Sequence, residues 1–129
     1  KKILNTAFDI LDGKKDILEV GNIDIKRDFG FAPKYVEAMY LMMQHEEPDH
    51  YILASGVSVS LKEIIFYIFD SLNIDRNKVM INKDLYRPNE IMENYGDASK
   101  ARKALNWQYD MSFFEVLDII INESIENKN

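Results

Sequence analysis

The chain has 129 residues with 47% hydrophobic side chains, no cysteine and a net charge of −6. This length suits a single domain, and the hydrophobic content is high enough for a packed core, which excludes disorder. The lack of thiols excludes disulfides, thiolate metal sites and a cysteine nucleophile. The acidic balance argues against nucleic acid as the main partner, and no apolar run is long enough to predict a membrane span.

The periodicity of the apolar residues predicts helices interspersed with short strands. Ser60 with Glu63, and Ser112 with Glu115, have the spacing of capping boxes and mark two helix starts, while Pro33 suits the first turn of another helix. In chain order the sequence predicts a helix over residues 3–12, a strand over 17–20, an extended loop over 24–31, a helix from 33 to about 45, a strand over 51–54, a helix over 61–72, a strand over 79–81, a loop over 83–95, a short helix from 97 to 105, and a last helix from 113 to about 125.

The helix that begins near Pro33 carries apolar side chains at helical spacing, and this stripe is expected to lie in the core. Methionine and tyrosine fill irregular core space well, so a cofactor-binding role is the less favoured interpretation. Trp107 is expected to be a hydrophobic anchor between two helices. The stripe consists of Tyr35, Val36, Met39, Tyr40 and Met43.

Together the elements predict a small mixed α/β lobe of about five helices and three short strands over residues 1–129. The strands are too few and too short for a complete doubly wound sheet, so we expect the lobe to pack on something else. The chain begins at Lys1 without a methionine, which suggests a piece of a longer protein. Such a lobe would expose a large apolar face, and we expect it to self-associate through that face.

Two short cationic segments are the candidates for ligand binding. Lys26 and Arg27 stand between a strand end and a helix start, where small-molecule sites are commonly built. Arg27 could donate two hydrogen bonds to phosphate or sugar oxygens. The alternative is a solvated surface pair that is balanced by Asp24 and Asp28.

The second cationic segment is a loop around Arg87 and Glu90. The proline that follows Arg87 biases it to extended geometry, so the loop could present the guanidinium group to a pyrophosphate. Glu90 would then be free to accept hydrogen bonds from a base or a hydroxyl. The alternative is a local ion pair between the two side chains, which is worth little at a surface.

The chain lacks the usual sequence signatures of catalysis. It contains no glycine-rich dinucleotide fingerprint, no Walker loop, no Tyr-x-x-x-Lys pair and no nucleophile elbow. No metal site is predicted, because two histidines are too few and the acidic residues lack ordered spacing. We therefore assign no catalytic residue and expect the chain alone to be inactive.

Five motifs resemble, in the same order, the GDP-mannose 4,6-dehydratase family, which is part of the extended short-chain dehydrogenases/reductases that act on sugar nucleotides. They cover nearly the whole chain, and their shared order makes the resemblance specific. The motifs are GNIDIKRDFGFAPKYVEAMYLMMQ, YILASGVSVSLKE, LYRPNEI, GDASKARKALNW and SFFEVL.

The resemblance implies the C-terminal, substrate-binding part of a Rossmann-type sugar-nucleotide enzyme, without its N-terminal dinucleotide-binding domain. The family enzyme is expected to be a cytoplasmic lyase that uses NADP to convert GDP-mannose to GDP-4-keto-6-deoxymannose, on the route to GDP-fucose. The implied partners are the nucleotide sugar, the N-terminal Rossmann domain and further copies of the parent enzyme. A GDP-4-keto-6-deoxyhexose reductase, another nucleotide-sugar epimerase or dehydratase, and a non-catalytic nucleotide-sugar binding module are the alternatives.

The resemblance also implies roles for five residues of this chain. The family's nucleotide-contacting arginine corresponds to Arg27, with Asn22 and Lys26 beside it, and its Arg-Pro-x-Glu pair corresponds to Arg87 and Glu90. By this analogy the two arginines hold the ribose and the diphosphate, and Glu90 lies toward the guanine. The sequence departs from the family pattern at Phe29, where tryptophan is common, at Pro33-Lys34, at Asn89, and at Asn106, where asparagine replaces a glycine but accepts left-handed geometry.

Overall fold

The computed structural model of the protein describes residues 1–127, which form five α-helices and five short strands. The helices are α1 (Lys2–Leu11), α2 (Ala32–Gln44), α3 (Leu61–Ser71), α4 (Ser99–Leu105) and α5 (Phe113–Glu126), and the strands are β1 (Leu18–Val20), β2 (Lys26–Asp28), β3 (Ser58–Ser60), β4 (Val79–Ile81) and β5 (Glu93–Asn94). Two 3₁₀ helices, η1 (Arg76–Lys78) and η2 (Lys83–Leu85), flank β4. None of the helices in this range has both the length and the hydropathy of a membrane span. The mixed α/β class with five helices is confirmed.

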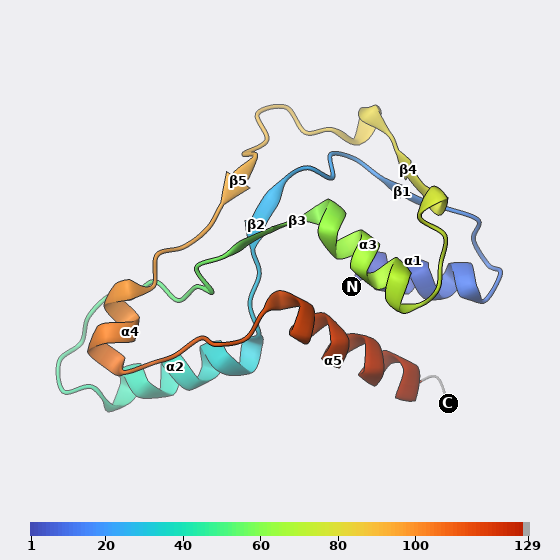
Figure 1. The fold of residues 1–129 in the computed structure, drawn as a ribbon. Helices are drawn as coiled ribbons and strands as arrows, with labels where there is room; N and C mark the ends of the chain where they lie inside the picture. Colours follow the sequence, from blue (N-terminus) through green and yellow to red (C-terminus); the bar gives the residue numbers. More distant parts are fainter. Residues whose placement is uncertain (128–129) are drawn as a thin grey trace.

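Two small sheets connect the helices. β1 pairs with β4 in parallel, and in the second sheet β2 lies between β3, to which it is antiparallel, and β5, to which it is parallel. α3 contacts both α1 and α5, while α2 contacts α4. In Figure 1 these two groups of helices lie at opposite ends of the molecule, with the three-stranded sheet between them.

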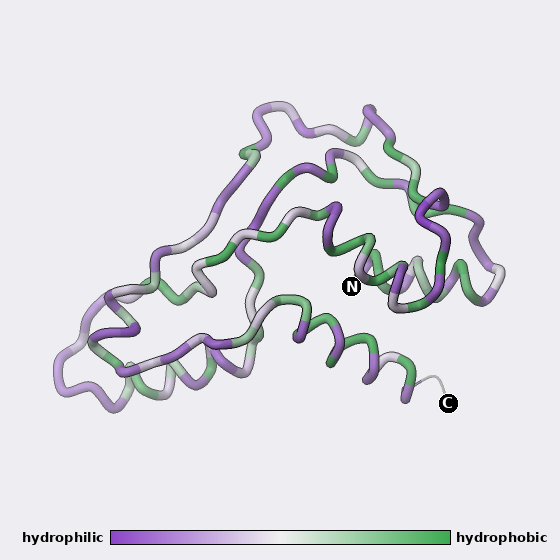
Figure 2. Tube along the Cα trace, viewed as in Figure 1, coloured by the Kyte–Doolittle hydropathy of each residue, from purple (hydrophilic) through white to green (hydrophobic). Residues whose placement is uncertain are grey.

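The larger hydrophobic core lies among α1, α3, α5 and β1. Ile65 and Phe69 of α3 and Leu18 of β1 are almost completely buried in it. α3 and α5 both begin with the predicted capping boxes, in which Ser60 pairs with Glu63 and Ser112 with Glu115. In Figure 2 hydrophobic and hydrophilic positions alternate along α3 and α5, as expected for helices with one buried face.

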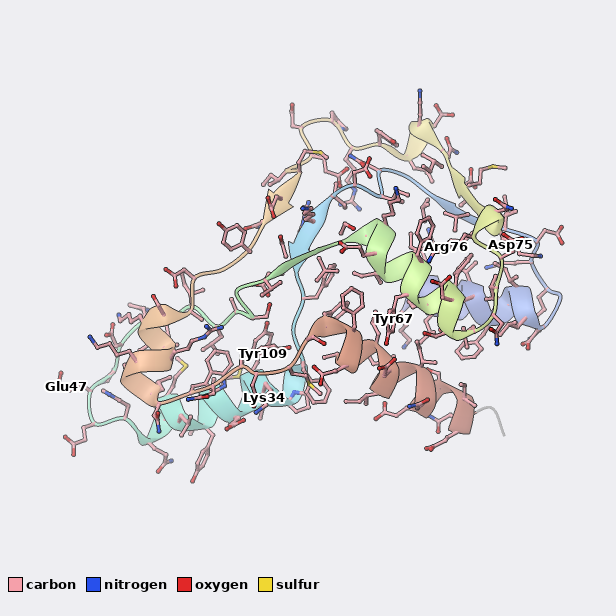
Figure 3. All side chains as sticks on the ribbon, in the orientation of Figure 1. Lys34, Glu47, Tyr67, Asp75, Arg76 and Tyr109 are labelled. Carbon is pink, nitrogen blue, oxygen red and sulfur yellow. The ribbon has the colours of Figure 1, made fainter. Side chains whose placement is uncertain are left out.

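A second, smaller core joins α2 to α4. Trp107 is 1% exposed, and its indole Nε1 donates a 3.0 Å hydrogen bond to the backbone oxygen of Lys34 in α2. The indole packs against Tyr35 and Tyr109, whose ring centroids lie 6.2 and 6.0 Å away. Asn106 ends α4 in the left-handed conformation, with φ of 50°. Trp107 therefore joins two helices as predicted; Figure 3 labels two of the residues that it contacts, Lys34 and Tyr109.

Two of the three strand predictions are confirmed, over residues 17–20 and 79–81. The predicted strand over residues 51–54 is wrong, because this apolar segment has no ladder partner among the described residues. The structure adds β2, β3 and β5, which fall within or beside predicted loops. β2 consists of three charged residues, so it lacks the alternation of apolar and polar side chains that marks a strand in a sequence.

The prediction of a buried stripe on α2 is wrong for four of its five residues. Tyr35 is partly buried, but the other four are exposed, and Met43 reaches 81%. α2 meets α4 through small side chains instead, because Ala38 and Ala101 are both 0% exposed and allow close approach of the helices. We call the exposed set the α2 stripe; it consists of Val36, Met39, Tyr40 and Met43.

Gly21 lies where the segment after β1 passes close to η2. A Cβ atom on Gly21 would lie 2.9 Å from the carbonyl oxygen of Leu85. We expect Gly21→Ala to lower the free energy of unfolding by about 1–3 kcal/mol, because the backbone of η2 must move away. Urea denaturation of the two proteins measures this difference. A variant as stable as the wild type would show that η2 can shift freely.

Candidate functional site

The first cationic segment is fixed by its position in the middle of a sheet. In the parallel pairing of β2 with β5, Lys26 lies opposite Glu93 and Arg27 opposite Asn94. The backbone nitrogen of Lys26 also donates a 2.7 Å hydrogen bond to the oxygen of Met92. Strands on both sides thus hold the backbone that carries the two cations.

The second cationic segment lies on the connection between η2 and β5. Met92, at the end of that connection, lies beside the first segment. Its backbone oxygen accepts the bond from Lys26, and its sulfur lies 3.5 Å from Nδ2 of Asn22. Arg87 is exposed and Glu90 is half-buried. The fold therefore brings the chain around Asn22 alongside the end of the loop that carries Arg87 and Glu90, although about 65 residues of sequence separate them.

The cations of these segments are not neutralised by ion pairs within residues 1–127. The ion pairs of this range involve other side chains, as in the pair of Arg76 with Asp70. Nη1 of Arg27 donates a 2.8 Å hydrogen bond to the backbone oxygen of Lys26 instead. The local pair of Arg87 with Glu90, which was the alternative for that loop, does not form among the described residues either.

A cavity of about 340 Å³ lies beside Arg27. Three segments form its walls, namely the end of β2, residues 52–54, and residues 94–96 with Tyr35 of α2. We call it the Arg27 cavity; it is lined by Arg27, Asp28, Tyr35, Ile52, Leu53, Ala54, Asn94, Tyr95 and Gly96. An arginine beside apolar and aromatic walls is suited to an organic anion.

The Asp28 carboxylate is the hub of the hydrogen bonds around this cavity. Oδ1 accepts bonds from the backbone nitrogen of Ser55 at 3.0 Å and from its hydroxyl at 2.6 Å. Oδ2 accepts from the backbone nitrogens of Gly56 at 2.9 Å and Gly96 at 3.2 Å. We call this arrangement the Asp28 clasp. Sequence reasoning treated Asp28 only as a counter-charge, and no local signal could have found partners that lie 27 to 68 residues away.

The clasp also sets the ionisation of Asp28. Partial burial alone would raise its pKa, but the hydrogen bonds from Ser55, Gly56 and Gly96 stabilise the charged form and hold the pKa below its usual value. Burial raises the pKa of the neighbouring Tyr35, and the Asp28 charge raises it further. At neutral pH the cavity therefore contains a fixed carboxylate and a neutral phenol.

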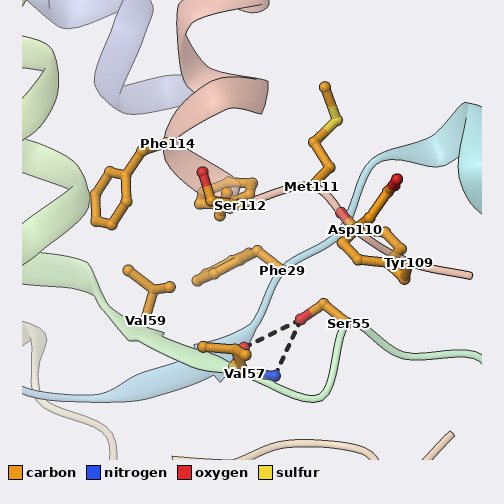
Figure 4. Close-up of a pocket in the computed structure, with 10 residues that line it drawn as sticks. Phe29, Ser55, Val57, Val59, Tyr109, Asp110, Met111, Ser112 and Phe114 are labelled. Carbon is orange, nitrogen blue, oxygen red and sulfur yellow. Dashed lines mark hydrogen bonds between the residues drawn. The ribbon is translucent and has the colours of Figure 1, made fainter.

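A second cavity, of about 280 Å³, lies on the other side of the clasp and is mostly apolar. Figure 4 shows Phe29 and Ser55 among the side chains around it, with residues 109–114 opposite. The ring of Phe29 stacks on Phe113 with centroids 4.8 Å apart, so phenylalanine fills the position where a tryptophan was expected by resemblance. None of the five predicted site residues lines this cavity.

The site as described combines the Arg27 cation with the Asp28 carboxylate and the Tyr35 phenol. The hydroxyl of Tyr109 already accepts a 2.7 Å hydrogen bond from the backbone nitrogen of Phe31. Within residues 1–127 no group of three histidine or acidic side chains could hold a metal ion.

Comparison with known sequences identifies relatives over almost the whole chain. A family model described as GDP-mannose 4,6 dehydratase matches residues 1–120. GDP-mannose 4,6 dehydratase 1 of Arabidopsis thaliana is 37% identical over 127 residues, which cover 98% of this chain and 35% of the relative. The human GDP-mannose 4,6 dehydratase is 32% identical over 146 residues, which cover 98% of this chain and 39% of the relative. The chain thus spans little more than a third of the length of these curated relatives.

Solved structures share the fold at low sequence identity. RMD from Pseudomonas aeruginosa, complexed with NADPH, matches with a TM-score of 0.81 at 22% identity, over 94% of this chain and 40% of that protein. UDP-glucose 4-epimerase from Thermotoga maritima, with UDP-glucose, matches with a TM-score of 0.82 at 15% identity, over 100% of this chain and 40% of that protein. The fold resembles the C-terminal part of such Rossmann-type sugar-nucleotide enzymes. Because the family model matches residues 1–120 of 129, the chain belongs to the GDP-mannose 4,6 dehydratase family.

Proposed function

We propose that this chain is the substrate-binding part of an NADP-dependent GDP-mannose 4,6-dehydratase, which converts GDP-mannose to GDP-4-keto-6-deoxymannose. The observation that carries the proposal is the unpaired guanidinium group of Arg27, which lines a cavity of about 340 Å³ in a chain whose net charge is −6. A guanidinium group without an ion pair favours an anionic ligand locally, against the field of the whole molecule, because the Asp28 carboxylate in the same cavity is already held by four hydrogen bonds. Membership of the family supports GDP-mannose as that ligand.

Each of the five predicted residues has a role in this proposal. Arg27 and Arg87 hold the ribose and the diphosphate, and Lys26 adds positive charge. Asn22 contributes to the substrate-binding site next to these cations, at the point where its Nδ2 lies 3.5 Å from the sulfur of Met92. Glu90 accepts hydrogen bonds from the N–H donors of guanine, because an ionised carboxylate is an acceptor only. The exposure of Arg87 and the lack of an ion pair with Glu90 support these roles, because both side chains are free to bind a ligand.

The hydride transfer and the elimination of water need residues and a cofactor that another domain would supply. We propose that an N-terminal Rossmann domain binds NADP and that it packs on the α2 stripe, since four exposed apolar side chains on one helix favour a partner surface. RMD is complexed with NADPH in its structure, which supports a nicotinamide cofactor for the parent enzyme. A cytoplasmic location and a homo-oligomeric parent belong to the same proposal and rest on the family resemblance.

Titration of GDP and GDP-mannose against the chain, with UDP and ADP as controls, tests the proposed ligand. We expect guanine-selective binding, and we expect Arg87→Ala to weaken GDP binding by about 1.5–3 kcal/mol, or roughly 10- to 150-fold, through loss of charged hydrogen bonds. Calorimetry measures the affinity, and NMR shifts locate the ligand near Arg27, Arg87 and Glu90.

Arg76→Ala is the matched control for this prediction, because it removes the same charge from an exposed arginine that already pairs with Asp70. GDP affinity should be the same in this variant as in the wild type. Tighter binding of UDP than of GDP would contradict the substrate, and an Arg87→Ala variant with full affinity would contradict the assigned role of that arginine.

A further inference from the structure

The Asp28 clasp lies between the two cavities of the molecule. Asp28 lines the Arg27 cavity, while the next residue, Phe29, lines the apolar cavity behind it. Ser55 likewise lines the apolar cavity, and the residue before it, Ala54, lines the Arg27 cavity. The hydrogen bonds between Asp28 and Ser55 therefore form part of the partition between the cavities.

The clasp ties together all three segments that form the walls of the Arg27 cavity. One wall is β2 itself, which ends at Asp28. The second wall, residues 52–54, leads directly into Ser55, and the third, residues 94–95, leads directly into Gly96. One carboxylate thus receives its four hydrogen bonds from the ends of the other two walls.

The two walls make few backbone hydrogen bonds outside the clasp, and residues 51–54 are otherwise held by side-chain packing in the smaller core. Residues 51–54 have no ladder partner among the described residues, and β5 is only two residues long. The walls touch each other closely, because a Cβ atom on Gly96 would lie 2.4 Å from the Cβ of Ala54. Outside the clasp, Nη2 of Arg102 donates a 2.8 Å hydrogen bond to the oxygen of Ser55. Loss of the Asp28 carboxylate would remove the hydrogen bonds that join both walls to the end of β2.

We propose that Asp28 is a positioning residue that acts through Arg27: it holds residues 52–56 and 94–96 against β2, so that the Arg27 guanidinium faces a cavity of fixed width. The inference rests on the proposed function, because the ligand it serves is the nucleotide part of a nucleotide sugar. Asp28 itself has its oxygens filled by the clasp and does not touch the ligand.

The test compares Asp28→Asn with the wild type by GDP titration and by the NMR signal of the Arg27 Nε–H group in the free protein. In asparagine an NH₂ group replaces one carboxylate oxygen, and this group cannot accept a hydrogen bond from a backbone N–H. The bonds to at least one of the two oxygen positions of Asp28 are therefore lost. Asp75→Asn is the matched control. The Asp75 carboxylate accepts a 2.8 Å hydrogen bond from the backbone nitrogen of Asn77, but Asp75 does not line the Arg27 cavity. Ser55→Ala is a milder variant that removes one of the four donors.

We expect folded Asp28→Asn to bind GDP about tenfold more weakly or worse and to shift or broaden the Arg27 signal, since the lost bonds involve a charged acceptor. Ser55→Ala should change both readouts in the same direction by less, and Asp75→Asn should change neither. A folded Asp28→Asn protein with wild-type affinity and an unchanged Arg27 signal would overturn the inference.

The remaining outcomes separate this inference from the proposed function. If Asp28→Asn does not fold, Ser55→Ala decides, and unchanged affinity and Arg27 signal in that variant overturn the inference. If the wild-type chain binds no guanine nucleotide, the proposed function loses its support. The Arg27 signal of the free variants still decides then, because an unchanged signal rejects the positioning role and a changed one supports it.

Discussion

Replacing Trp107 with alanine is expected to lower the free energy of unfolding by about 3–5 kcal/mol, the range found for large aromatic side chains removed from a core. The indole is 1% exposed, and its Nε1 bonds to Lys34 of α2. Because Trp107 follows α4 directly, its loss should separate α4 from α2. Urea denaturation measures the overall change, and amide exchange shows where protection is lost.

The control for this prediction is Tyr40→Ala, which removes an aromatic ring from the exposed face of the same α2 helix. Tyr40 is 62% exposed, so we expect a change within about 0.5 kcal/mol. Trp107→Phe should lie between the two, because it keeps most of the buried ring but leaves the Lys34 oxygen without its donor. Equal stability of the Trp107→Ala protein and the wild type would refute the anchor role.

Where local chemistry decides the structure, the sequence was sufficient to predict it. The capping boxes at Ser60 and Ser112 start helices as expected, and Asn106 takes the left-handed conformation that ends α4. Asp97, where the short helix was expected to start, accepts a 2.9 Å hydrogen bond from the backbone nitrogen of Ser99, but the N-cap residue of α4 is Ala98 and it makes no side-chain cap bond. Residues 79–81 form a strand that pairs in parallel with residues 18–20.

Where tertiary contacts decide the structure, the predictions from the sequence were wrong. Residues 51–54 have the composition of a strand, but a strand requires ladder hydrogen bonds to a partner backbone, and this segment forms no ladder with any described segment. The spacing of the α2 stripe predicts one apolar helix face, yet it does not say what covers that face. α2 packs on α4 through Ala38, and Met43 is left 81% exposed. Both errors are consistent with a lobe that packs on a further domain.

The candidate site could be predicted in part. The cations at 26, 27 and 87 were evident from the sequence, but on spacing alone they could equally have been balanced surface charges. The structure places Arg27 at a cavity without an ion pair among the described residues, and the Asp28 carboxylate lines the same cavity. The Asp28 clasp could not be predicted, because its donors are backbone amides whose positions depend on the completed fold.

Phe69→Ala is the second change expected to lower the free energy of unfolding by about 3–5 kcal/mol. Phe69 of α3 is 0% exposed in the larger core, where the helices α1 and α5 and the strand β1 meet. Phe66→Ala is the matched control on the same helix, since its ring is only partly buried and lies under Arg76 at 4.6 Å. The free energy of unfolding of the Phe66→Ala protein should fall by no more than roughly half as much, because part of the apolar surface of the Phe66 ring is already in water.

The double variant Trp107→Ala/Phe69→Ala then tests whether the two cores unfold as one unit. The cores share no buried residue, so within one cooperative transition the two effects should add to within about 0.5 kcal/mol. We expect this additivity, because the Asp28 clasp and the sheet around β2 join the two ends of the molecule. Each single variant should then lower amide protection in both cores. Loss of protection confined to α2 and α4 in Trp107→Ala, with α3 unchanged, would show instead that the clasp region is a hinge between two independently stable parts.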